Sequence, residues 1–245
     1  MSIHNPAVGV DVKAMNSKPV HIARRRASAL IIAAPAIWVS SRTQAQAQAQ
    51  SDGQANTPSP DSRAIQPTER RYTPAQMEGP FYPVVMPKDA DFDLLRNGAR
   101  QYRRGAPVWV QGTVTDLSGK PVSGAVVEIW QSDQDGHYDH PGDGNRADPD
   151  FQGFGRFNVG SDGQYRFRTI RPTRYPGRTP HIHFKVKLGQ RELLTTQLYV
   201  DGDPGNAGDM LWRRLRADAD RGALTVPFVP GSDGLVAQFP IIVRA

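Results

Sequence analysis

Two histidines and two tyrosines are the side chains of this sequence best suited to bind a metal ion. His181 and His183 are one residue apart, and in an extended strand the side chains at positions i and i+2 point to the same side. Tyr175 lies six residues before this pair, and Tyr138 lies further upstream. Imidazole and phenolate donors together suit ferric iron better than structural zinc, which prefers thiolate and imidazole ligands. The pattern therefore indicates one metal site at the histidine pair.

Each of these residues also has an ordinary structural interpretation. A His-x-His pair on a strand is often a surface or packing pair, and Tyr138 lies in a segment that is typical of a turn. Other aromatic residues lie in strand patterns and are expected to pack in the core. These are Trp109, Trp130, Tyr165 and Tyr199, whereas Tyr82 suits a pocket and the core equally well.

The composition excludes several other kinds of chemistry. The 245 residues include no cysteine, which rules out disulfides, thiolate metal sites and cysteine nucleophiles. The formal net charge is +6, but five of these charges belong to residues 1–50, where six basic residues stand against one acidic residue. The rest of the chain is nearly neutral and offers no basic surface for a phosphate backbone. We therefore expect no nucleic-acid partner.

The first 47 residues have the parts of an export signal. Three consecutive arginines, 24–26, precede an apolar stretch at 27–39, and an Ala-Gln alternation from Ala45 offers a cleavage site. The apolar stretch is shorter than the ~20 residues of a membrane span, so we expect no stable span. Paired arginines before a mildly apolar segment are typical of twin-arginine signals. They predict a partnership with the twin-arginine export machinery and a periplasmic or extracellular location in a bacterium.

The alternative interpretation of this N-terminal region is a disordered basic tail. We also expect translation to begin at Met15, which would leave an ordinary length of basic sequence before the apolar stretch. Residues 48–70 are rich in Gln, Ala, Ser and Pro and have almost no large apolar side chain, which predicts a disordered linker. The catalytic domain is then expected at 71–245.

The sequence of this domain predicts a series of short strands. Glycine (23 residues) and proline (21 residues) are frequent, which favours strands and turns over a helical bundle. Strands are expected at 108–115, 126–130, 155–159, 164–169, 181–188, 193–199 and 240–243, and only residues 209–220 have a helical pattern. This arrangement predicts an all-β fold, an antiparallel β-sandwich with long loops and one short helix, in which loops at one end present the metal site.

Several segments together resemble the intradiol ring-cleavage dioxygenases. They are residues 112–114 with 121–125, then 127–131, 135–138, 175–183 and 196–199, and the run EGPFY at 78–82 is similar to the motif that opens the domain of that family. The resemblance extends from about Tyr72 to the C-terminus. Its most specific part is the joint pattern of two tyrosines, one arginine and the His-x-His pair.

The resemblance implies one mononuclear non-haem Fe(III) ion bound by four side chains. Tyr138 and His183 would be equatorial ligands, and Tyr175 and His181 would be axial. Fe(III), two phenolates and one hydroxide sum to zero formal charge, which limits the cost of burying the ion. A catechol dianion that replaces one phenolate and the hydroxide keeps that sum at zero, so the released ligands would accept the protons of the substrate.

The resemblance also implies an activity and the residues beside the substrate. A small aromatic diol and O2 would react to give a muconate-type diacid, with Tyr175 as the ligand that leaves. Arg178 would stabilise the electron-rich ring through its fixed planar charge, and Gln197 would hydrogen-bond the same region. Because Tyr138 supplies the oxygen ligand in this scheme, His137 and His140 are expected to face solvent.

Several alternatives remain open at this stage. The stretch between Tyr175 and Arg178 is shorter than in protocatechuate enzymes, so the ring substituents of the preferred substrate are undetermined. Whether the chain forms a homo-oligomer is also left open by the sequence. Residues 51–70 do not supply the helical dimerisation region of catechol-type members, which favours the protocatechuate branch. The β-sandwich is expected to be prealbumin-like. The rival function is a metal-free prealbumin-like or adhesin-like binding module. A zinc hydrolase is disfavoured because the motif contains no carboxylate that could act as a general base.

Overall fold

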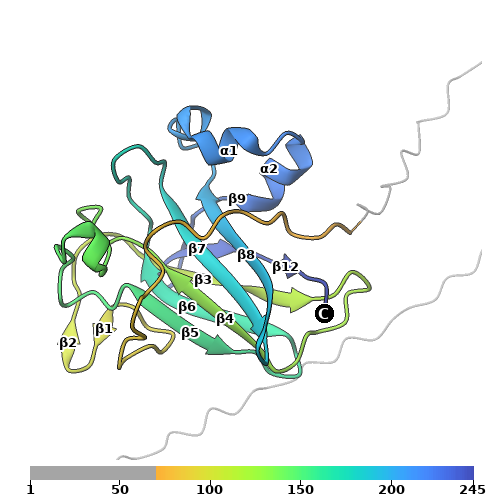
Figure 1. Cartoon of the computed structure of the whole chain (residues 1–245), viewed down its shortest axis with the longest axis horizontal. Coiled ribbons are helices and arrows are strands. Elements are labelled where there is room, and N and C mark those ends of the chain that lie inside the picture. Colours follow the sequence, from red (N-terminus) through yellow and green to blue (C-terminus); the bar gives the residue numbers. More distant parts are fainter. Residues whose placement is uncertain (1–69) are drawn as a thin grey trace, which may run out of the picture. The chain divides into compact units, whose positions relative to one another are not determined.

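The computed structural model of the chain describes residues 70–245, and in this part strands far outnumber helices (Figure 1). The predicted export signal, and the predicted linker except its last residue, lie outside the described residues. Within the described part, no helix has the length and the apolar character needed to cross a membrane.

One five-stranded sheet is built around β3 (Pro107–Thr115). On one side, β6 (Gln164–Ile170) pairs with β3 in antiparallel orientation. The other neighbours, β11 (Gly234–Gln238) and β12 (Ile241–Ile242), follow each other along β3 and run parallel to it. β10 (Val229–Gly231) completes the sheet beside β11. Between β11 and β12 the chain passes so close to Gly112 that a Cβ there would clash with the carbonyl oxygen of Phe239.

The second sheet carries the histidine pair. Its strand order is β5 (Phe154–Asn158), β4 (Ala125–Trp130), β7 (His181–Leu188), β8 (Arg191–Val200) and β9 (Thr225–Val226). All neighbours are antiparallel except β8 and β9, which are parallel. Figure 1 shows two short helices, α1 (Met210–Arg214) and α2 (Asp218–Leu224), together near β9. A two-stranded ribbon of β1 (Arg96–Asn97) and β2 (Arg100–Gln101) and two 3-10 turns, η1 (Pro141–Asp143) and η2 (Asn206–Gly208), complete the described elements.

Apolar side chains from both five-stranded sheets form one hydrophobic cluster. Strand β3 contributes Val108, Val110 and Val114, and the second sheet contributes residues such as Ile129 and Phe184, each of them almost fully buried. Strand β7 shows how this core positions the candidate site. Ile182, Phe184 and Val186 belong to the cluster, so the period of two along the strand sends His181, His183, Lys185 and Lys187 to the opposite face.

The all-β prediction is confirmed, and each of the seven predicted strands corresponds to a strand of the structure within a few residues. The prediction of purely antiparallel pairing is wrong, because β11, β12 and β9 each run parallel to a neighbour. The single helix predicted at 209–220 is two helices in the structure. The backbone becomes extended at Leu215, and the side chain of this residue is buried in the core. Strands β1, β2, β9, β10 and β11 were not predicted.

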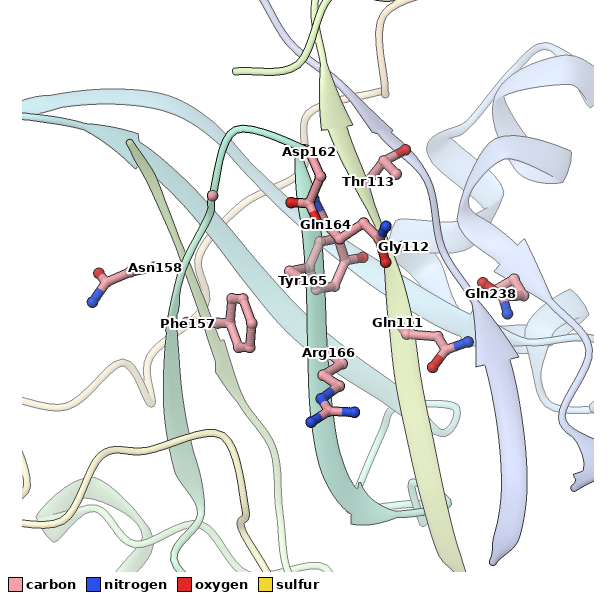
Figure 2. A pocket seen from close by; sticks show the side chains of 11 residues that line it. Gln111, Gly112, Thr113, Phe157, Asn158, Asp162, Gln164, Tyr165, Arg166 and Gln238 are labelled. Carbon is pink, nitrogen blue, oxygen red and sulfur yellow. The ribbon is translucent and has the colours of Figure 1, made fainter. Parts of the chain in front are cut away.

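Trp109 is a further correction. It is partly exposed rather than part of the core, and the guanidinium groups of Arg166 and Arg168 lie 5.4 and 5.7 Å from its ring. A cleft of about 570 Å³ lies nearby, and Figure 2 shows the ring of Phe157 pointing from β5 toward β6 there. The cleft is lined by Gln111, Gly112, Thr113, Phe157, Asn158, Gly160, Asp162, Gln164, Tyr165, Arg166 and Gln238. None of the six candidate site residues lines this cleft.

Candidate metal centre

The two histidine rings converge at the first residues of β7. Their Nε2 atoms are 3.1 Å apart, and both side chains are buried, with exposed fractions of 2% and 1%. His183 is held between two strands, since it faces Trp130 on β4 and Gln197 on β8 in the register of the sheet. The indole of Trp130 stacks on the His183 ring at a centroid distance of 4.7 Å. The predicted convergence of the two imidazoles is therefore present.

Both rings are neutral, and this is the state that binds a metal. The Nδ1 atom of His181 donates to the carbonyl oxygen of Thr179 at 2.6 Å, which leaves Nε2 as the lone-pair nitrogen. Burial and then the charge of Arg178 lower the pKa of His181 to about 3. Burial, His181 and Arg178 also lower the pKa of His183 well below its ordinary value. With its ring proton on Nδ1, His183 would turn a second lone pair toward that of His181, and a cation could then bind both Nε2 atoms.

Tyr138 comes from the loop after β4 and is buried beside the histidines, with its hydroxyl 3.4 Å from His181 Nε2. The loop is held by local polar contacts, because Asp143 accepts a hydrogen bond from the Tyr138 amide and Asp133 accepts one from the His137 amide. Burial, followed by the nearby Tyr175, raises the pKa of Tyr138 well above its ordinary value. The phenol is thus neutral by itself, and only a strongly charged cation would hold it as phenolate.

Tyr175 joins the cluster from the turn before β7. Its ring lies 5.4 Å from the ring of Tyr138, perpendicular to it, and 5.6 Å from the ring of His181. The turn is closed by a hydrogen bond from the Arg178 amide to the Tyr175 carbonyl oxygen, and Gly177 adopts the positive φ of 81° that this turn requires. Tyr175 is half-buried, unlike the other three candidate ligands. It therefore forms the more accessible side of the cluster.

Arg178 and Gln197 lie beside the cluster and contact each other. Arg178 Nη2 donates to Gln197 Oε1 at 2.6 Å, and Arg178 Nη1 is 3.4 Å from His181 Nε2. Gln197 is fully buried, and its Nε2 donates to the carbonyl oxygen of Met77. The structure thus brings all six predicted site residues into one region, and a planar cation borders the histidine nitrogens.

The segment before β1 covers this region. Phe81 stacks on Tyr138 at a centroid distance of 4.7 Å and meets Tyr175 edge-on at 5.9 Å. Gly79 has a φ of 77°, and a Cβ there would lie 3.4 Å from His183 Cε1, so the backbone passes close over the imidazole. Ion pairing of Glu78 with Lys185 anchors the segment to β7. This cover keeps bulk water away from the histidine nitrogens.

Some residues of the site were not predicted or were predicted wrongly. His140 is buried rather than solvent-facing, because its Nδ1 accepts from the Gly142 amide at the start of η1 and its ring meets Phe81. His137 is half-buried, 3.6 Å from Asp143, so it does not face solvent freely either. Tyr199 is buried as predicted, but its hydroxyl also contacts Gln197. Asp209 holds Arg178 from 31 residues away and has no local sequence signal.

The donor set fits the ferric ion implied by the sequence. In residues 70–245 no group of three or more His, Cys, Asp and Glu side chains is arranged to hold a metal. Any metal at the histidine pair would therefore need the tyrosine oxygens, and two imidazoles with two phenols are a donor set for a hard, redox-capable ion. The second ring nitrogen of His183, Nδ1, is buried and has no hydrogen-bond partner among the described residues.

Comparison with known proteins gives matches in sequence and in structure. A sequence profile of a family described as "Dioxygenase" matches residues 77–219. The 6-chlorohydroxyquinol 1,2-dioxygenase of Cupriavidus pinatubonensis is 38% identical over 143 residues, which are 51% of this chain and 49% of that protein. The protocatechuate 3,4-dioxygenase beta chain of Burkholderia cepacia is 40% identical over 136 residues, 50% of this chain and 57% of that one. The chain thus spans about half the length of the curated relatives it matches.

Two solved structures are similar to the described fold. The dioxygenase domain of a dioxygenase carbohydrate-binding protein fusion from Streptomyces sp. SirexAA-E is 33% identical, with a TM-score of 0.57 over 71% of this chain and 99% of that one. The catechol 1,2-dioxygenase of Acinetobacter sp. ADP1 is 27% identical, with a TM-score of 0.56 over 70% of this chain and 62% of that one.

Proposed function

The chain belongs to the intradiol ring-cleavage dioxygenase family, and from this premise we propose that it is an iron(III) enzyme that opens catecholic rings. The reaction would break the bond between the two hydroxylated carbons of a small aromatic diol. Both atoms of O2 would enter the product, a muconate-type diacid. The observation that carries the proposal is the convergence of two neutral, buried imidazoles and two tyrosines beside one arginine.

The residues that would hold the ion are Tyr138, Tyr175, His181 and His183. When bound, Fe(III) would supply the positive charge that keeps the phenols ionised and draws electron density from the diol. The resemblance to the family implies that Tyr175 is the ligand that leaves the ion when the diol binds. Its half-buried position supports that assignment, because a half-buried ring can move with less repacking than the buried ring of Tyr138. Tyr175 Oη is then the proposed acceptor of one substrate hydroxyl proton.

Arg178 is the proposed stabiliser of negative charge on the substrate ring. Its guanidinium is mostly buried, and it borders the histidine nitrogens on one side and Gln197 on the other. A fixed planar cation in a site that excludes water stabilises developing charge more strongly than the same cation in solvent. Gln197 would orient this guanidinium, and Phe81 would exclude water from the site.

The proposal extends to the fold type and to the location of the protein. A prealbumin-like sandwich is supported by the single core shared by the two five-stranded sheets.

Export through the twin-arginine route, to the periplasm or the extracellular space, is supported by the arginines at 24–26 and the apolar stretch that follows them.

Oxygen uptake by the purified, iron-loaded chain tests the proposed reaction. The panel would contain catechol, protocatechuate, hydroxyquinol and a chlorinated catechol, and the ring-opened acid would be identified by mass. We expect one O2 consumed per diol for at least one substrate, with both oxygen atoms in the product. Absence of uptake with the whole panel, despite stoichiometric iron, would favour the rival function of a binding module.

A further inference from the structure

Asp209 is a buried carboxylate with a complete set of hydrogen-bond donors. Its side chain has no exposed surface, and its Oδ1 accepts from the amides of Leu211 and Trp212 at 2.9 and 3.0 Å, which caps helix α1. Its Oδ2 accepts from Arg178 Nε at 2.7 Å and from the Thr179 amide at 3.0 Å. One carboxylate thus joins the start of α1 to the turn that carries Arg178.

This contact holds the Nε side of the Arg178 guanidinium, and Gln197 and Tyr199 contact its Nη2 atom. With Nε held by Asp209, Nη2 meets Gln197 Oε1 at 2.6 Å and Nη1 lies 3.4 Å from His181 Nε2. Asp209 is the only carboxylate among the described residues in an ion pair with Arg178. The negative charge also compensates a cation that is mostly removed from water, and an uncompensated buried cation would be strongly unfavourable.

We propose that Asp209 is a positioning residue, which acts on the reaction through Arg178 by fixing the guanidinium toward the histidine nitrogens. This inference rests on the proposed function, because Arg178 is taken to stabilise charge on the bound diol. Asp209 makes no hydrogen bond to a candidate metal ligand, since its four donors are Arg178 and three backbone amides. It lines the same cavity as Tyr175 and Arg178, where its carboxylate faces the guanidinium.

The Asp209→Asn substitution tests the proposal, because the amide oxygen can still cap α1 while the charge facing Arg178 is lost. We expect kcat to fall by about 10- to 100-fold, the range typical of residues that orient a functional group. Iron content, the visible colour and the KM for the diol should change little. Asp209→Ser, which also keeps a capping oxygen, should show the same loss. Asp203→Asn is the matched control, because Asp203 also pairs with an arginine and accepts a backbone amide, but does not contact Arg178.

A double-mutant cycle separates positioning from a purely structural role. In the Arg178→Ala background, adding Asp209→Asn should change kcat by less than about 2-fold, because the group through which it acts is gone. An equal fold-loss from Asp209→Asn in both backgrounds would overturn the proposal. So would an unchanged kcat in the single Asp209→Asn variant.

Crystal structures of the wild-type chain and the Asp209→Asn variant would test the inference without a measurement of the reaction. We expect the contact between Arg178 Nη2 and Gln197 Oε1 to be lost in the variant, while α1 remains in place. If the wild-type chain oxidised no diol, the proposed function would fail. The position of the Arg178 guanidinium in the two crystal structures would still show whether Asp209 orients it. An unmoved guanidinium in the variant would overturn the inference.

Discussion

At the scale of single residues, the two imidazoles are oriented by different means. His181 is oriented by a hydrogen bond from Nδ1 to Thr179, whereas His183 is oriented by stacking on Trp130 and has no partner for Nδ1 among the described residues. Outer contacts of this kind set both the tautomer and the direction of a metal-binding nitrogen. His183 therefore depends on the packing of its own strand and its neighbour for its orientation.

The candidate ligands should differ in their response to substitution. His183→Ala is expected to abolish iron binding, because no other donor in the described region can replace a nitrogen buried between β4 and β8. Tyr175→Phe is expected to keep part of the iron and lose most turnover, because the other three donors remain and the proposed proton acceptor is gone. The measurements are iron per chain by atomic emission and oxygen uptake with a diol.

Tyr72→Phe provides the control for these variants, because Tyr72 is an exposed tyrosine whose ring pairs with Arg244 rather than with the cluster. It should bind iron and turn over like the wild-type chain. Stoichiometric iron in the His183→Ala protein would contradict the assignment of that residue as a ligand.

Residues of the site could be predicted where they lie in a short pattern. The spacing of His181 and His183 predicted their convergence, because a strand places alternate side chains on one face. Asp209 and the polar role of Tyr199 could not be predicted, because their partners are distant in sequence or on a neighbouring strand. The burial of His140 could not be predicted, because a loop histidine with no periodic pattern gives no signal of the capping contact that buries it.

At the scale of elements, β7 separates the core from the site by its alternation. One face contributes Phe184 to the hydrophobic cluster, and the other carries the histidines and two lysines. The lysine end of that face is joined to neighbouring strands through Glu128 of β4, which has no exposed side-chain surface. Glu128 accepts from Tyr82 at 2.8 Å and from Arg156 at 2.8 Å, and it pairs with Lys187 at 3.0 Å. This network anchors the segment that covers the candidate metal centre.

Glu128 should contribute to stability in a way that depends on pH. Burial alone would raise the pKa of Glu128, but hydrogen bonds from Lys187, Tyr82 and Arg156 outweigh burial and lower this pKa below its ordinary value. The carboxylate therefore stabilises the fold above the unfolded pKa, near 4.3, and this contribution is lost as the pH falls through the lower folded pKa. We expect Glu128→Gln to reduce the free energy of unfolding at pH 7 by about 1–3 kcal/mol.

The expected signature is a difference between wild type and Glu128→Gln that shrinks as the pH falls below about 4, the region where this carboxylate gains its proton. Urea unfolding followed by circular dichroism at several pH values measures it. Glu192→Gln is the control, because the Glu192 side chain that pairs with Lys185 is half exposed to solvent, so its loss should change stability by less than about 1 kcal/mol. A pH-independent difference for Glu128→Gln would contradict the account.

The elements themselves were predictable to different degrees. Long strands with alternating or continuously apolar sequence, such as β3 and β4, were predicted to within about a residue, because each carries its own signal of burial. Strands of two or three residues, such as β9 and β10, have too few positions for a pattern, and the parallel pairing of β9 and β11 depends on partners elsewhere in the chain. The break between α1 and α2 arises from burial of Leu215, which is a tertiary effect.

At the scale of the whole molecule, charge is distributed unevenly along the chain. Residues 1–50 hold most of the net positive charge, and the rest is nearly neutral. This asymmetry supports the proposed export function of the N-terminal region, since basic residues before an apolar stretch are read by export machinery. Export in a folded state would allow the metal to be bound before transport.

Changing the paired arginines should block export. With Arg24→Lys and Arg25→Lys combined, the consecutive arginines of the proposed signal are removed while the positive charge is kept. We expect the chain to remain in the cytoplasmic fraction of a bacterial host, whereas wild type and the control Arg42→Lys should reach the periplasm or the medium. The measurement is fractionation followed by immunoblotting. Equal export of all three proteins would contradict the twin-arginine assignment.

The measurement that bears most directly on the proposed metal centre is the iron content and visible spectrum of the purified wild-type chain. Phenolate bound to ferric iron absorbs visible light by charge transfer, so we expect one iron per chain and a reddish colour. The colour should weaken and shift when Tyr138 alone is replaced by phenylalanine, because Tyr175 remains as a phenolate, and it should be lost when both tyrosines are replaced. A colourless protein that takes up no ferric ion on reconstitution would contradict the assignment of Tyr138, Tyr175, His181 and His183 as ligands of one iron.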